Sequence, residues 1–204
     1  MLDTTERLVA LAMWLGARLG ISALELDLLQ RAAHFCKADL ATEMVVEMTS
    51  LQGIMGMKYA LLSGEPEAVA RAIYEHYLPR SADDALPTSQ IGTVLALADR
   101  LDSLAGLFAV GMEPTGTSDP YGLRRAAAGL VQILLERGLS FSVREGLIEA
   151  ARLMPVEAAT EDFELYHDLV GELRERSVRF TTIQPGEPLP DVTSALVVGT
   201  DDDP

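Results

Sequence analysis

Cysteine is almost missing from this 204-residue sequence, in which Cys36 is the only one. A single thiol allows no intrachain disulfide and no cluster of thiolates around a metal ion, so the sequence favours a reducing, cytoplasmic compartment. Aromatic residues are scarce as well, at 5% of the chain, while hydrophobic residues as a whole make up 49%. The core must therefore consist of Leu, Ala, Val and Met, a mixture that favours helices over strands.

Long apolar runs and targeting signals are also lacking. No stretch approaches the ~20 apolar residues that a membrane-spanning helix needs. The first residues, Met1 to Glu6, contain no basic group and precede no long apolar run, which argues against a signal peptide. The sequence contains no P-loop, no dinucleotide-binding glycine pattern and no Ser/His/Asp nucleophile arrangement. We therefore expect no membrane partner, and no cofactor in this segment.

Positive charge is the scarcer sign, and the net charge is −15. Residues 1–144 hold 12 basic and 17 acidic groups, a net charge of −5, whereas residues 145–204 hold 4 basic and 14 acidic groups, a net charge of −10. Such a surface repels a phosphate backbone on average, so any nucleic-acid contact must be a local basic patch. We expect no binding to DNA.

The sequence does contain a series of helical segments with clear start and stop signals. Ser22–Glu25 and Ser142–Glu145 read as capping boxes, and Asp3 and Asp119 read as N-caps. Helices are expected over about residues 3–20, 22–45 (with a break near residue 39), 51–62, 66–78, 88–110, 119–137, 142–154 and 160–173. The fold class is therefore all-α, with about seven to nine helices. We divide the chain into a helical domain, residues 1–155, and a helical extension and linker, residues 156–204.

Polar residues at fixed points between the apolar segments are the candidates for chemistry. The first candidate is His76 with Asp99, Asp102 and Asp39. Metal-dependent phosphohydrolases of the HD superfamily use a His, a tandem His-Asp and a later Asp on converging helices, and the helix order here is similar. Cys36-Lys37 stands where such proteins carry the tandem His-Asp. A lysine there is adverse to a divalent ion, because a fixed cation replaces the negative charge of a ligand. We expect a degenerate site at Cys36, Lys37, His76 and Asp99, without a metal.

Two further motifs are weaker. His167-Asp168 is the one literal tandem His-Asp, but a chance dipeptide on an exposed helix explains it better. Residues 114–119 form a small-residue loop that leads into a helix carrying Arg124 and Arg125, and helix N-termini can bind phosphate oxygens. The carboxylate of Asp119 would fill that position itself, so a well-capped helix with two surface arginines is an equal alternative.

Taken together, the motifs resemble the β subunit of the bacterial α2β2-type glycyl-tRNA synthetase over about residues 5–155. The sequence departs from the family pattern at Met48-Thr49-Ser50, where the family tends to have Phe-Pro-Glu, and at Gly122, which replaces an alanine. The matching motifs are Lys37-Ala-Asp39-Leu40, Leu51-Gln-Gly53, Met55-Gly56, Gly64-Glu65, Glu75-His-Tyr77, Leu86-Pro-Thr88, Ala98-Asp99, Pro114-Thr-Gly116, Asp119-Pro120 and Leu123-Arg-Arg125.

The resemblance implies an HD-like helical domain that precedes an anticodon-binding domain in a much longer subunit. It implies that the α subunit activates glycine with ATP and that the β subunit binds glycine tRNA. The partners would then be this tRNA, the α subunit and the rest of the β subunit, and this segment would be noncatalytic. We expect RNA contacts through Lys37, Lys58, Arg124 and Arg125. The alternatives are an HD-type phosphohydrolase and a free-standing interaction module derived from the family.

Overall fold

The computed structural model describes residues 2–112, 114–115 and 118–155, and these residues are helical apart from their turns and one isolated bridge between Thr115 and Ser118. The all-α prediction with seven to nine helices is confirmed, since this part of the chain contains eight α-helices and two short 3-10 helices. They are α1 (Leu2–Arg18), α2 (Ala23–Phe35), η1 (Ala38–Ala41), α3 (Glu43–Glu47), η2 (Thr49–Leu51), α4 (Ile54–Leu62), α5 (Glu67–Glu75), α6 (Gln90–Ala109), α7 (Leu123–Glu136) and α8 (Val143–Arg152).

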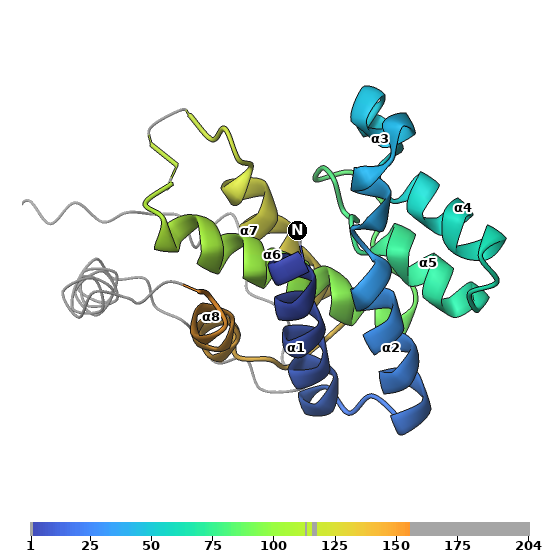
Figure 1. Cartoon of the computed structure of the whole chain (residues 1–204). Helices are drawn as coiled ribbons and strands as arrows, with labels where there is room; N and C mark the ends of the chain where they lie inside the picture. Colours follow the sequence, from blue (N-terminus) through green and yellow to red (C-terminus); the bar gives the residue numbers. More distant parts are fainter. Residues whose placement is uncertain (1, 113, 116–117, 156–204) are drawn as a thin grey trace, which may run out of the picture. The chain divides into compact units, whose positions relative to one another are not determined.

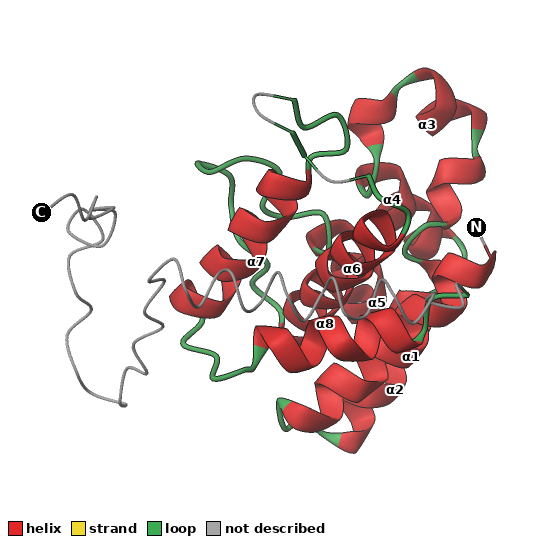
Figure 2. Ribbon diagram, turned by 90° about the vertical axis from the view of Figure 1, so that its left-hand side faces the viewer, coloured by secondary structure: helices red, strands yellow, loops and turns green. Residues whose placement is uncertain are grey.

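Helix α6 lies in the middle of the domain, with α1, α2, α5, α7 and α8 packed against it (Figures 1 and 2). Its side chains are buried on nearly every side, among them Leu95, Leu97 and Leu101. A helix that is apolar all round can only be stable when neighbours cover it all round. The helix predicted for residues 88–110 is therefore the centre of the core, and Asp99 and Asp102 enter the core on the same helix.

Several of the predicted helix starts are confirmed in the structure. Ser22 accepts a hydrogen bond from the backbone of Glu25, whose carboxylate accepts one from the backbone of Ser22, which completes the predicted capping box. Ser142 caps α8 with one bond, which it accepts from the amide of Glu145. The cap assigned to Asp3 is wrong, because α1 already begins at Leu2.

The second predicted helix is shorter than expected. Residues 22–45 divide into α2, η1 and α3, and the break falls at Cys36 and Lys37, just before the predicted position. The helix predicted from residue 51 begins at Ile54, because Gly53 has a φ of 75° that ends the preceding turn. A Cβ atom at Gly53 would lie 2.6 Å from the Tyr77 ring, so the Tyr77 side chain packs closely against this glycine.

The helix predicted from residue 119 begins four residues later, at Leu123. Asp119 stays outside the helix and accepts hydrogen bonds from the amides of Leu123 (2.8 Å) and Arg124 (3.0 Å) with its two oxygens. Its carboxylate therefore occupies the place where an anion would bind at this helix N-terminus, as the sequence suggested. The predicted segment 156–204, including His167-Asp168, lies outside the described residues, and the predicted division of the chain stays a prediction.

Candidate functional site

The side chain of Lys37 joins three separate elements of the fold. Lys37 directly precedes η1, His76 directly follows α5, and Asp99 lies in the middle of α6. The Lys37 ammonium lies 2.9 Å from Oδ1 of Asp99 and 3.0 Å from Nε2 of His76. It also lies 4.4 Å from the centre of the Tyr77 ring, a cation–π distance. The structure thus brings together three of the four residues predicted as a degenerate site.

Hydrogen bonding and burial define the charge state of this cluster. Nδ1 of His76 lies 2.6 Å from the carbonyl oxygen of Ile73 and donates to it, which leaves Nε2 as an acceptor for the Lys37 ammonium. Burial, followed by the nearby Lys37 cation, lowers the pKa of His76 to about 3, so the imidazole is neutral. A neutral imidazole between an ammonium and a backbone carbonyl holds its ring in one orientation.

The Lys37–Asp99 pair stays ionised although it is mostly buried. Burial favours the neutral form of both side chains, but their mutual attraction is stronger. The carboxylate of Asp99 thus holds the pKa of Lys37 above its usual value, and Lys37 holds the pKa of Asp99 below its own. The side chains are only 13% and 18% exposed. The cluster therefore carries one positive and one negative charge and is neutral as a whole.

These residues do not fit a divalent metal ion. His76 and Asp99 converge on an ammonium, and a cation in that place repels a second one. The thiol of Cys36 donates to the carbonyl of Ala33, and burial raises the pKa of Cys36 to about 12, so no thiolate is available. Within the part of the chain that the structure describes, no group of three or more His, Cys, Asp and Glu side chains is arranged for a metal.

The other two carboxylates of the predicted set have separate partners. Asp102 accepts two hydrogen bonds from the Arg7 guanidinium, at 2.8 and 3.1 Å, and so ties α1 to α6. Asp39 accepts a hydrogen bond of 2.7 Å from the amide of Gly53. A hollow of about 340 Å³ lies beside the Lys37–Asp99 ion pair. It is lined by Thr4, Lys37, Leu40, Asp99, Asp102 and Ser103.

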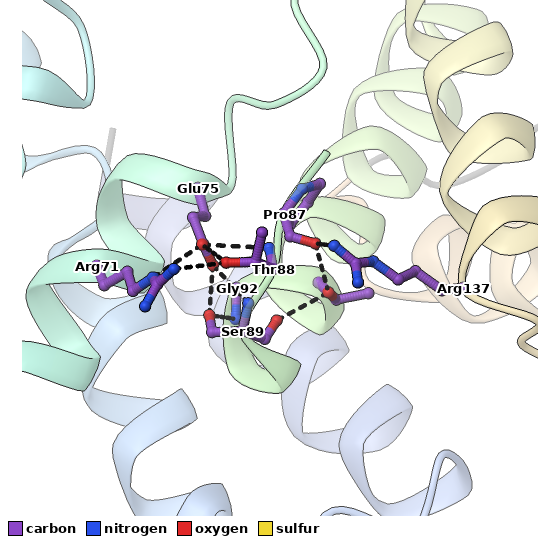
Figure 3. Close-up of polar contacts among 8 residues, drawn as sticks. Arg71, Glu75, Pro87, Thr88, Ser89, Gly92 and Arg137 are labelled. Carbon is purple, nitrogen blue, oxygen red and sulfur yellow. Dashed lines mark hydrogen bonds and ion pairs between the residues drawn. The ribbon is translucent and has the colours of Figure 1, made fainter. Parts of the chain in front are cut away.

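Glu75, which the sequence shows only as part of the Glu75-His-Tyr77 motif, is a further residue of the site. Its carboxylate accepts from the amides of Thr88 and Ser89, from both of their hydroxyl groups and from the guanidinium of Arg71 (Figure 3). Burial would raise the pKa of Glu75, but the hydrogen bonds from Ser89 and Thr88 outweigh burial and lower the pKa to about 2. Because Ser89 caps α6, Glu75 joins the end of α5 to the start of α6 and positions His76 relative to Asp99.

Arg100 completes the support on the other side of His76. Its buried guanidinium donates to the backbone carbonyls of His76 (3.2 Å), Ala96 (3.0 Å) and Pro79 (3.0 Å). A Cβ atom at Gly129 of α7 would lie 2.9 Å from Nε of Arg100, so the approach of α7 depends on that glycine. The sequence signal for both supports was a charged residue directly next to a site residue, Glu75 beside His76 and Arg100 beside Asp99.

The four predicted RNA contacts do not form one patch. Lys58 is exposed on α4, and Arg124 and Arg125 are exposed on the first turn of α7, on helices that lie apart in both views (Figures 1 and 2). Lys37 does not offer its ammonium to a phosphate in this structure, because Asp99 and His76 hold it inside the domain. None of the described helices combines the length and apolar composition that a membrane crossing requires.

The fold and the site define a helical domain whose polar centre is closed by an internal ion pair and lacks a metal-ligand set in the described residues. Sequence comparison adds the family. The family model described as glycyl-tRNA synthetase beta subunit matches residues 1–184, so the chain belongs to that family. This confirms the resemblance of the sequence motifs.

Individual relatives agree with the family match. The chain is 51% identical over 158 residues to the glycine–tRNA ligase beta subunit of Myxococcus xanthus (strain DK1622), covering 78% of this chain and 22% of that protein. It is 50% identical over 147 residues to the protein of the same description from Halalkalibacterium halodurans, covering 72% of this chain and 21% of that protein. The chain thus spans about a fifth of the length of the relatives that it matches.

Proposed function

We propose that this chain serves as a noncatalytic part of a glycine–tRNA ligase β subunit, which acts in the cytoplasm together with an α subunit. It positions glycine tRNA and supports the assembly of the subunits, while the whole enzyme uses ATP. The observation that carries the noncatalytic role is the Lys37 ammonium between His76 and Asp99, which takes the place that a catalytic cation would need. The family match supports the ligase.

We interpret the helical domain as HD-like, with its former metal chemistry replaced by the internal ion pair. An HD-type phosphohydrolase needs a divalent ion to polarise a phosphoryl group. The two donors that converge here, His76 and Asp99, are both engaged by Lys37. The same three side chains that disfavour the phosphohydrolase thus support a role in holding α2, α5 and α6 together.

For the RNA contact, we propose Arg124 and Arg125, with Lys58 as a separate and weaker contact. One arginine guanidinium binds two phosphate oxygens at once, whereas a lysine ammonium acts as a point charge. Because Asp119 occupies the first free amides of α7, the contact would be made by the guanidinium groups and not by the helix N-terminus. The net negative charge of the chain restricts RNA to such a local patch.

The test is tRNA binding by the full-length β subunit assembled with its α subunit. Arg124→Ala with Arg125→Ala is expected to weaken binding of glycine tRNA by about tenfold. The number of counterions released on binding, measured from the salt dependence of the affinity, should fall by roughly two. Glycine activation should stay unchanged, because this segment takes no part in it. The matched control is Arg144→Ala, an exposed arginine on α8. If the double variant binds tRNA like the wild type, the two arginines do not contact RNA.

A further inference from the structure

A short projecting segment exposes several large apolar side chains. Between Leu40 and Gln52 the chain leaves the helical core, forms α3 and η2 and returns to α4, and α3 packs mainly on the two 3-10 helices beside it. Figures 1 and 2 show α3 standing out from the other helices. From Glu43 to Ser50 only Val45 is buried. We name five of the exposed residues in this segment the α3 knob: Glu43, Met44, Val46, Glu47 and Met48.

The base of the α3 knob is fixed by hydrogen bonds and packing. The carboxylate of Asp39 accepts from the amide of Gly53 at 2.7 Å and so closes the two ends of the excursion. The hydroxyl of Thr42 donates to the carbonyl of Asp39 at 2.7 Å, and Val45 anchors the knob in the interior. Because this base fixes the segment, the exposure of its apolar side chains is a feature of the fold and does not result from a frayed helix end.

The chemistry of the knob is apolar and acidic. Met44 is 46% exposed, Val46 66% and Met48 52%. Helical spacing places Met44 on one side of the Glu43–Glu47 pair and Val46 on its other side. Met48 follows the helix directly, and its amide donates to the carbonyl of Met44 at 3.0 Å. No lysine or arginine occurs between Ala38 and Met57, so nothing within this stretch of the sequence balances the two glutamates.

We propose that the α3 knob is a docking surface for another polypeptide, whose surface carries Lys or Arg opposite Glu43 and Glu47 and apolar residues on both sides of that basic pair. The acidic pair repels RNA phosphates and anionic lipid headgroups, and the methionines favour an apolar protein surface to which their flexible side chains can adapt. The docking surface is distinct from the proposed RNA contact, since it uses α3 and not α7, and it does not depend on tRNA binding.

A photo-crosslinking experiment tests the docking surface. A benzophenone amino acid replaces Val46 in the protein expressed in its own cells, and the crosslinked peptides are identified by mass spectrometry. The matched control places the same probe at Leu62, an apolar residue at the end of α4 that is 84% exposed. We expect a crosslink from position 46 to one protein segment containing Lys or Arg beside apolar residues, and no such product from position 62. The double substitution Glu43→Lys with Glu47→Lys should reduce the yield of the crosslink from position 46 about tenfold.

The identity of the crosslinked molecule shows which kind of partner covers the α3 knob. A crosslink to RNA, to a second copy of this chain, or none above the level of the Leu62 control overturns the proposal. With the crosslinked partner purified, Met44→Ser with Met48→Ser should raise its Kd about tenfold or more, while Leu62→Ser leaves the Kd unchanged. An unchanged Kd for the methionine variant, with an unchanged melting temperature, also overturns it. Loss of tRNA binding in the Arg124/Arg125 variant affects neither result, so the two proposals fail independently.

Discussion

The ammonium of Lys37 lies 2.9 Å from the Asp99 carboxylate in a place where neither side chain reaches solvent freely. The pair connects the segment after α2 to the middle of α6, and the neutral imidazole of His76 completes the contact from α5. A buried ion pair of this kind need not be more stable than an apolar pair, but removal of one partner leaves an uncompensated charge. This asymmetry gives the first testable consequence.

Lys37→Met should lower the free energy of unfolding by about 3 kcal/mol, because Asp99 then stays buried without its counter-charge. The measurement is equilibrium unfolding in urea at neutral pH. Lys37→Met combined with Asp99→Leu should recover most of the loss, since the second change removes the unpaired carboxylate. If the double variant is as unstable as the sum of the two single variants, the pair does not act as a unit.

The convergence of Lys37, His76 and Asp99 was predictable from the motifs, but their geometry was not. The resemblance to HD proteins placed Cys36, Lys37, His76 and Asp99 around one centre, and the structure brings the last three together. Periodicity continued the helix through Lys37, whereas the chain turns there into η1. That turn decides where the ammonium lies. It also withdraws Lys37 from the RNA surface on which the sequence had placed it.

The helix starts also show that local sequence patterns predict some features of the structure and miss others. Ser22 and Ser142 cap the helices that the sequence assigns to them, because a capping box depends only on residues three positions apart. Asp119 caps α7 from four residues before its first residue, across a left-handed Gly122 with a φ of 70°. The pattern Asp-Pro predicts an immediate helix start, so the longer Asp119 cap could not be predicted from local rules.

Glu75 gives the second prediction, which concerns pH. Glu75→Gln should lower the free energy of unfolding at pH 7 by about 1–3 kcal/mol, because an amide cannot accept all the hydrogen bonds that the carboxylate accepts from residues 88 and 89. The folded pKa of about 2 lies below the unfolded value of about 4.3, so this carboxylate stabilises the fold above that unfolded value. The stabilisation is lost as the pH falls toward about 2.

The difference between wild type and Glu75→Gln should therefore shrink between about pH 5 and pH 2. Unfolding in urea over this range measures it. Glu67→Gln is the control, since Glu67 lies exposed on the same helix and its substitution should change the stability by less than about 0.5 kcal/mol. A pH-independent difference between wild type and Glu75→Gln would show that the carboxylate charge does not act through these hydrogen bonds.

The third prediction compares two glycines at the two ends of α4. Gly53 and Gly64 have positive φ values of 75° and 81°, which strain an alanine by about 1–2 kcal/mol or more, and Gly53 combines its φ with a ψ of −39°. A Cβ atom at Gly53 would lie 2.6 Å from Tyr77, whereas at Gly64 it would meet nothing within 4 Å. Gly53→Ala should therefore cost about 1–3 kcal/mol more than Gly64→Ala, because it adds overpacking to backbone strain. Thermal unfolding of the two variants provides the comparison, and equal melting temperatures contradict the contact with Tyr77.

The last prediction is that the purified protein carries no stoichiometric Mn, Fe or Zn. The Lys37 ammonium already lies between the two donors that converge, His76 and Asp99, so a divalent ion there would face a fixed positive charge at contact distance. Elemental analysis measures the metal content, and thermal unfolding with added Mn²⁺ provides a second readout. A site at 100 times its Kd would stabilise the fold by about 2.7 kcal/mol, so an unchanged melting temperature is a sensitive result.

The metal prediction needs variants that distinguish this cluster from adventitious binding. Asp99→Asn removes one of the two donors, and His34→Ala removes an exposed histidine outside the cluster. About one metal ion per chain that is lost in Asp99→Asn and kept in His34→Ala would contradict the prediction and the noncatalytic role with it. Metal that is lost only in His34→Ala would be bound at the surface, and the ion pair of Lys37 and Asp99 would still explain why the centre of the domain excludes it.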